Sequence, residues 1–140
     1  SGALVTIVER QTSFSVSTRI NDKSAETVTA ATIALLEPYK AAVLTITADN
    51  GKEFAYHEQM TDALDAKVYF ADPYCSWQRG LNENTNGLLR QYWPKKTDFK
   101  KISQMEVSSV LLELNERPRK KLNYQTPAKL MAEHMAGLAA

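Results

Sequence analysis

Two acidic residues, Asp49 and Glu83, occur where a carboxylate could bind a metal ion. Asp49 follows the apolar run 41–46 (AAVLTI) and precedes Asn50-Gly51. Asn-Gly after alternating apolar residues is also the usual sign of a two-residue hairpin turn, in which Asp49 would be only a turn residue. Glu83 lies in a segment expected to be helical, where a solvated surface glutamate is the ordinary alternative. These residues alone leave both alternatives open.

The pattern of the whole chain predicts an α/β domain. Residues 3–9 and 14–20 are rich in β-branched residues and predict two strands joined by a short turn. Further strands are expected at 43–48 and 67–71, and helices at 24–37, 53–64, 77–93, from Gln104 and from Pro127. Strands that alternate with helices after an opening hairpin predict a mixed sheet with helices packed on it. We expect one domain over 1–140, with its core at about 1–95 and a C-terminal helical extension at about 96–140.

The helix expected at 77–93 would carry Glu83 on its outer side. The opposite side holds four residues expected to pack on the sheet: Leu81, Thr85, Leu88 and Tyr92. Gly80 and Gly87 each cost about 1 kcal/mol relative to alanine in a helix interior. The two glycines therefore predict a close approach to this helix, either by DNA or a metal ion, or by another packed helix.

Composition excludes several classes of protein. The 140 residues are 44% hydrophobic, which is enough to build a core. No apolar run approaches the roughly 18 residues needed to span a membrane. Cys75 is the single cysteine, so an internal disulfide is impossible and a reducing compartment is expected. His57 and His134 are far apart in sequence and lack cysteine partners, which argues against a zinc site.

Charge is distributed unevenly along the chain. Residues 1–89 hold seven Lys or Arg against eleven Asp or Glu, whereas residues 90–121 hold nine against four. A basic stretch of this kind suits phosphate binding, because cations displace the counterions of a nucleic acid. A solvated lysine-rich surface would give the same count, so charge alone does not decide.

Three segments together resemble the catalytic core of the DDE transposase and retroviral integrase superfamily. They are TADNGKEF (47–54), PYCSWQRGLNENTNGLLRQYWPK (73–95) and LNERPRKKLNYQTP (114–127). The resemblance covers nearly the whole chain and is nearest to bacterial insertion-sequence transposases of the IS-thirty type. It implies a ribonuclease-H-like fold, a five-stranded mixed sheet flanked by helices. Its active site would be three carboxylates that hold two divalent ions, Mg²⁺ or Mn²⁺.

Within that resemblance, Asp49 matches the second carboxylate and Glu83 the third. This favours the metal-ligand role of Asp49 over the turn role, and hard carboxylate oxygens suit Mg²⁺. The family's first Asp lies on a strand before residues 3–9, and neither Glu9 nor Asp22 is in the right place for it. We therefore expect a fragment that lacks the first strand, leaves an unpaired sheet edge, and is inactive by itself.

The resemblance also implies contacts with DNA, both the ends of a mobile element and its target. Lys52 is one basic candidate. The others lie in the helix expected at 77–93 or in the basic stretch 90–121: Arg79, Arg90, Lys95, Lys96, Arg117, Arg119, Lys120 and Lys121. Three asparagines of the third helix are further candidates: Asn82, Asn84 and Asn86. We expect a homodimer or higher multimer, no membrane association, and a cytoplasmic location in a bacterium.

The expected function is metal-dependent DNA strand cleavage followed by 3′-hydroxyl strand transfer during transposition. Two alternatives remain open. One is a ribonuclease-H-like nuclease that cuts without joining. The other is a non-catalytic DNA-binding or dimerisation remnant, which the missing first Asp favours and the paired Asp49 and Glu83 disfavour.

Overall fold

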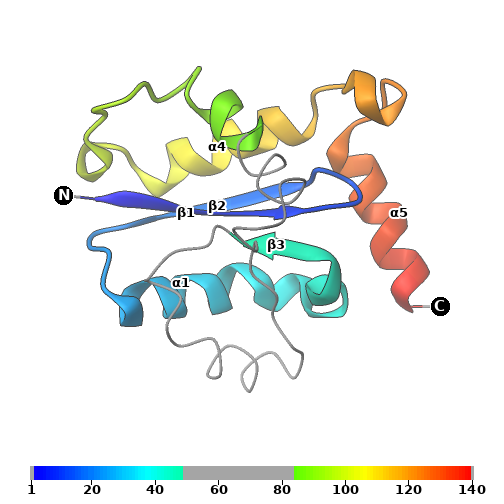
Figure 1. The fold of residues 1–140 in the computed structure, drawn as a ribbon, viewed down its shortest axis with the longest axis horizontal. Helices are drawn as coiled ribbons and strands as arrows, with labels where there is room; N and C mark the ends of the chain where they lie inside the picture. The colour runs from blue at the N-terminus through cyan, green and yellow to red at the C-terminus, as the bar shows by residue number, and fades with distance from the viewer. Residues whose placement is uncertain (1, 49–83, 140) are drawn as a thin grey trace, which may run out of the picture.

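The structure is a computed structural model, and it describes residues 2–48 and 84–139 (Figure 1). The helix expected at 53–64 and the strand expected at 67–71 lie outside the described residues. Residues 84–89 are helical. The other strands, α-helices and 3-10 helices (η) are β1 (Ala3–Glu9), β2 (Ser15–Ile20), α1 (Ala25–Leu36), η1 (Glu37–Thr45), β3 (Ile46–Ala48), η3 (Phe99–Lys101), α4 (Gln104–Asn115), η4 (Lys120–Leu122) and α5 (Pro127–Ala139).

The described strands form one sheet in the order β2-β1-β3, so β1 is central. β1 pairs antiparallel with β2 and, over its last three residues, antiparallel with β3. The expected opening hairpin is confirmed. The strand expected at 43–48 is wrong in its first half, because the chain runs as the 3-10 helix η1 up to Thr45. Pro38 fits the first turn of η1, which packs against α1 and α5, so tertiary contacts override the β-branched pattern.

The helix starts expected from sequence are confirmed by their capping bonds. Ser24 Oγ accepts the N–H of Thr27 at 3.2 Å at the start of α1. Ser103 Oγ accepts the N–H of Glu106 at 3.1 Å at the start of α4. Thr126 does the same for α5, whose first residue is a proline. Each cap satisfies a backbone donor that the helix itself cannot pair.

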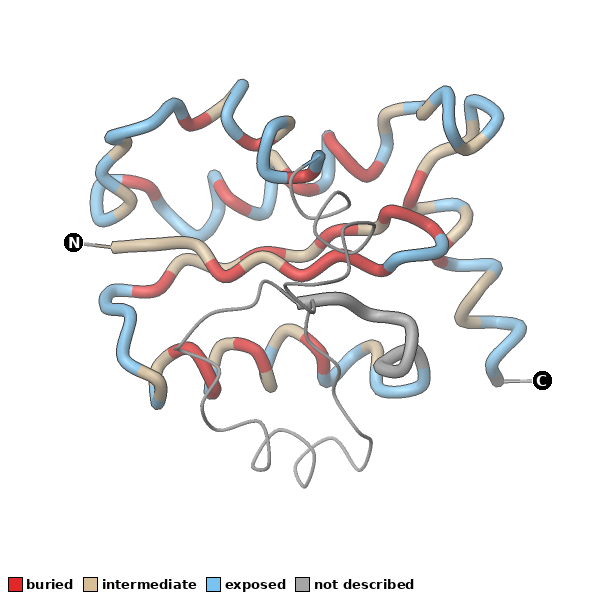
Figure 2. Tube along the Cα trace, viewed as in Figure 1, coloured by how far each residue is buried: buried red, intermediate tan, exposed pale blue. Residues whose placement is uncertain are grey.

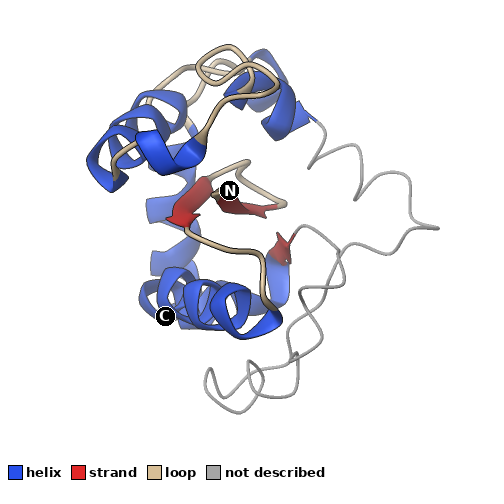
Figure 3. Cartoon of the chain, turned by 90° about the vertical axis from the view of Figure 1, so that its left-hand side faces the viewer, coloured by secondary structure: helices blue, strands red, loops and turns tan. Residues whose placement is uncertain are grey.

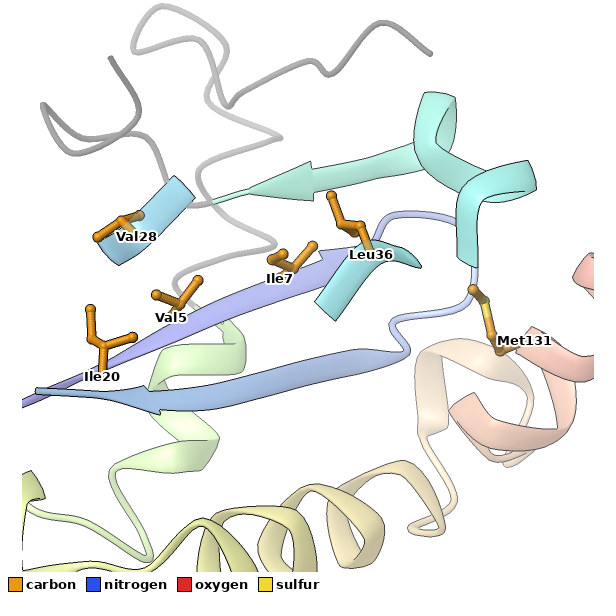
Figure 4. Packing of buried hydrophobic residues seen from close by; sticks show 6 residues of the cluster. All are labelled: Val5, Ile7, Ile20, Val28, Leu36 and Met131. Carbon is orange, nitrogen blue, oxygen red and sulfur yellow. The ribbon is translucent and has the colours of Figure 1, made fainter. Parts of the chain in front are cut away.

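The sheet lies between two helical layers, one containing α1 and the other α4, with α5 at one end of the sheet (Figures 1 and 3). Buried residues follow β1 and β2 and the helix sides that face them (Figure 2). On the α1 side, Val5, Ile7 and Ile20 pack with residues of α1 and with Met131 of α5 (Figure 4). On the α4 side, Leu4 packs against a second cluster. The alternation along β1 therefore supplies both cores.

Side chains from α4 cover the outer edge of β2. Asn115 Oδ1 accepts the N–H of Ser15 at 2.9 Å, and Asn115 Nδ2 donates to the carbonyl of Ser15 at 2.8 Å. At the other end of α4, Gln104 Oε1 accepts the N–H of Arg19 at 3.0 Å. The amide of Asn115 thus pairs with β2 as a neighbouring strand would, which blocks the edge against further pairing.

The described residues cover the other edge of β1 only in part. The N–H groups of Ser15 and Arg19 point away from β1. Because this orientation alternates along an antiparallel pair, the N–H groups of Leu4, Thr6 and Val8 point away from β2. β3 covers this edge from Ile7 to Glu9. Among the described residues, the backbone groups of Leu4 and Thr6 have no partner on that side. Within residues 2–48 and 84–139, the expected unpaired edge is limited to the first half of β1.

Replacing Asn115 by alanine should destabilise the protein by roughly 2–4 kcal/mol, because it removes two buried hydrogen bonds and leaves both polar groups of Ser15 unpaired. The matched control is Gln104→Ala, whose bond to β2 is exposed and can be replaced by water. Its cost should stay below about 1 kcal/mol. Urea denaturation measures both, and equal losses would contradict the edge-blocking role of Asn115.

Candidate functional site

The two predicted metal ligands, Asp49 and Glu83, lie outside the described residues, as do Lys52, Arg79 and Asn82. Their direct neighbours in the chain are described. Ala48, next to Asp49, pairs with Ile7 of β1. Asn84, next to Glu83, begins the helical residues 84–89. Within the described ranges, no group of three or more His, Cys, Asp or Glu side chains could hold a metal ion.

The segment after Glu83 is fixed by a buried stripe that differs from the expected one. Thr85, Leu89 and Trp93 are buried, whereas Leu88 and Tyr92 are only half-buried. The expected stripe is confirmed at Thr85 and is displaced by one residue after it, while Leu81 lies outside the described residues. The reason is tertiary: Leu89 and Trp93 bury against Ile102 and α4, and the large indole gains most from burial. The regular helix ends at Leu89, four residues earlier than expected.

Gly87 distinguishes the two explanations offered for the glycines of this helix. It is exposed, and a Cβ built on it would meet no atom within 4 Å. Close packing against another helix therefore does not explain Gly87 within the described part of the chain. The space next to Gly87 is open within the described part of the chain. Gly80 lies outside the described residues.

A cleft of about 730 Å³ lies along the open half of the β1 edge. Residues 2–6 form one side, Val28 of α1 contributes from one helical layer, and Leu89 and Trp93 contribute from the other. Three of the predicted DNA-binding residues line this cleft: Asn86, Arg90 and Lys96. Lys23 and Lys100 line it too, and sequence reasoning missed both.

Lys96 is held at the cleft by a tight turn. The N–H of Thr97 donates to the carbonyl of Pro94 at 3.2 Å, and Lys96 in between has a φ of 73°. This left-handed conformation suits glycine, and costs other residues roughly 1–2 kcal/mol. A strained lysine at the rim of a cleft is the kind of outlier that points to function.

Two predicted DNA-binding residues carry out structural roles instead of pointing freely to solvent. Arg117 donates from Nη2 to the hydroxyl of Tyr92 at 2.8 Å. Arg119 donates from Nη2 to the carbonyl of Leu114, in the last turn of α4, at 3.0 Å. Burial raises the pKa of Tyr92, and a hydrogen bond with Glu113 acts in the same direction. Lys95, Lys120 and Lys121 are exposed and are not among the residues that line the cleft.

The chain is similar to bacterial insertion-sequence transposases. It is 47% identical over 126 residues to the transposase for IS4351 from Bacteroides fragilis, a match covering 90% of this chain and 39% of that protein. It is 40% identical over 134 residues to the transposase InsI for IS30A from Escherichia coli K12, covering 95% and 35%. It is 40% identical over 135 residues to the transposase for IS1086 from Cupriavidus metallidurans, covering 96% and 40%.

The chain thus spans about two fifths of the length of these relatives. No protein-family model matches it. Its fold is similar to that of the catalytic core domain of BIV integrase, with a TM-score of 0.63 and 22% sequence identity, covering 94% of this chain and 90% of that one. The expected ribonuclease-H-like α/β fold is confirmed by this likeness. In the described ranges, no helix has the length and apolarity to cross a membrane.

Arg119→Ala should destabilise the fold by roughly 1.5–3 kcal/mol, because a cationic donor to the C-terminal end of α4 is lost. Lys120→Ala removes the same charge from an exposed neighbour and should stay within about 0.5 kcal/mol of the parent. Thermal unfolding compares the two variants. A parent-like stability for Arg119→Ala would return Arg119 to the set of freely exposed cations.

Lys96→Gly should stabilise the chain by about 0.5–1 kcal/mol, since relief of the left-handed backbone outweighs the extra freedom of glycine in the unfolded chain. Lys95→Gly, one residue earlier, should instead destabilise it by about 0.5–1 kcal/mol. Chemical denaturation measures both changes. A loss of stability in both variants would show that Lys96 carries no backbone strain.

Proposed function

Because the chain belongs to the DDE transposase and integrase superfamily, we propose that it is the catalytic core of a DNA transposase. Such a core cleaves DNA strands and joins the freed 3′-hydroxyl to target DNA. The observation that carries the proposal is the combination of transposase relatives with the fold of an integrase catalytic core. The cleft with Asn86, Arg90 and Lys96 is consistent with it.

Asp49 and Glu83 are the metal ligands in this proposal, and two Mg²⁺ or Mn²⁺ ions are the expected occupants. The donor set fits, because both side chains are carboxylates and such ions prefer oxygen ligands. Bound ions would supply charge stabilisation for an in-line displacement at phosphorus. The 140 residues provide two of the three carboxylates that the resemblance implies, so we expect weak metal binding and no activity from these residues alone.

The described residues position the DNA and do not perform the chemistry. Arg90 and Lys96 are exposed cations at the cleft and would neutralise the phosphate backbone near the reacting strand. Asn86 can donate or accept a hydrogen bond there. Trp93 and Leu89, both buried, fix the segment that carries these side chains. A rigid support matters because small misplacements of reacting groups are costly in rate.

DNA is the partner in this proposal, both as the ends of a mobile element and as the target. Two ends must be joined in one event, so we propose that the working form is a homodimer or higher multimer. A bacterial cytoplasm, where chromosomal DNA is accessible, is the proposed location. Static light scattering with and without end DNA would measure the assembly.

In a transposase that contains this chain, Asp49→Asn and Glu83→Gln should each lower strand transfer by at least about 10²-fold while leaving DNA binding intact, because each removes one negative ligand without changing shape. The assay uses labelled, pre-cleaved element-end DNA, a plasmid target and Mg²⁺ or Mn²⁺. Glu116→Gln, an exposed carboxylate beyond the end of α4, is the matched control.

The products separate the alternatives. Joined strands that vanish in the Glu83→Gln protein support a transposase. Nicked but unjoined DNA would instead support a nuclease of the same fold. DNA binding without any reaction would leave a binding module, and full activity in both carboxylate variants would refute the assignment of Asp49 and Glu83.

A further inference from the structure

Two lysines far apart in the sequence meet at the cleft. Lys23 lies between β2 and α1, and Lys100 belongs to η3. Both line the cleft together with Arg90 and Lys96. Lys23 lies just before the start of α1. Arg90, Lys96 and Lys100 lie in the segment that leads into α4 (Figure 1). Cations therefore approach the cleft from both helical layers.

These four cations are available to a ligand. All four side chains are exposed, and none forms an ion pair with another residue in the described ranges. Asp98 is the one acidic residue among the described lining residues, and its carboxylate accepts the backbone N–H of Lys100 at 3.0 Å. Among the described lining residues four positive charges face one negative charge, and Asp22 next to Lys23 adds a second carboxylate near Lys100, so a net positive potential remains at the cleft.

The backbone that carries Lys100 is fixed against the start of β1. A Cβ on Gly2 would lie 3.0 Å from the backbone nitrogen of Lys100 and 3.1 Å from the carbonyl oxygen of Ile20, so only glycine fits without a shift. Across the same end of the sheet, hydrogen bonds from Ser24 lower the pKa of Asp22, and the charge of Lys100 contributes further. Lys100 is therefore near the loop that carries Lys23.

We propose that Lys23 and Lys100 extend the DNA-binding surface of Arg90 and Lys96 across the cleft, so that all four contact phosphates of one DNA backbone. The inference rests on the proposed function and adds two residues to it. The cations come from two separate parts of the chain and line a cleft of about 730 Å³. That spread fits a polyanion better than a single small anion, which is usually held by convergent donors.

The test measures DNA binding by the 140-residue chain. Fluorescence anisotropy of a labelled duplex oligonucleotide reports the affinity across a range of salt concentrations. In the Lys23→Gln/Lys100→Gln protein, affinity should fall at least about tenfold at 0.1 M salt, and the slope of log K against log salt should become shallower by about 1.8. Lys101→Gln/Lys129→Gln removes the same charge from exposed positions outside the cleft lining and should change neither quantity appreciably.

The outcomes separate this inference from the proposed function. One outcome is that the Lys23→Gln/Lys100→Gln protein binds DNA like the parent while the Arg90→Gln/Lys96→Gln protein loses affinity. That outcome would overturn the inference and leave the transposase proposal standing. The cleft would then suit another occupant, such as an extended peptide pairing with Leu4 and Thr6. Equal losses in the Lys101/Lys129 control, or no binding by the parent chain, would also overturn it. Circular dichroism melts establish that each variant is folded.

Discussion

The alternation of side chains along β1 is the constraint on which both helical layers depend. Val5 and Ile7 pack toward α1, while Leu4 packs toward the cluster of α4. A shift of one residue in the pairing would exchange the two faces and empty both cores. Glu9 holds the register at the turn, because its Oε1 accepts the N–H groups of Gln11 and Thr12 at 3.0 and 2.8 Å.

The two outer edges of the β1–β2 hairpin are covered by different groups, and the cleft lies at the edge that is covered less. Asn115 closes the edge of β2 with a side chain that imitates a strand. The edge of β1 is closed by β3 only from Ile7 onward. The remaining half faces a cleft with cations on its rim, so the sheet is polar where a ligand can approach and sealed where a second sheet could attach.

The parts of the fold that sequence could predict are those governed by local bonds. Ser24, Ser103 and Thr126 each accept an N–H three residues ahead, and such a cap is visible in a short window of sequence. The buried stripe ending at Trp93 was not predictable in the same way, since it depends on Ile102 and α4 meeting it in space. The 3-10 helix before β3 likewise follows from tertiary packing overriding a strand-like composition.

For the candidate site, motif and charge gave different kinds of information. The roles predicted for Asp49 and Glu83 come from the resemblance of the surrounding motifs, and both residues lie outside the described ranges. The count of basic residues in 90–121 could not separate Arg119, bound to a helix carbonyl, from Arg90 at the cleft. Nor could it find Lys23, which lies in the acidic part of the chain and joins the cleft only through folding.

The attachment of both predicted ligands explains why this fold suits the proposed chemistry. Ala48 precedes Asp49 and lies in β3 opposite Ile7 of β1. Asn84 follows Glu83 and opens the segment that buries Leu89 and Trp93. Catalytic groups must be held within about 0.5 Å of a productive geometry, and strands or helices achieve this better than loops. Because Ala48 pairs with β1 and Asn84 opens the segment anchored by Leu89 and Trp93, the folded core holds the chain next to each predicted ligand.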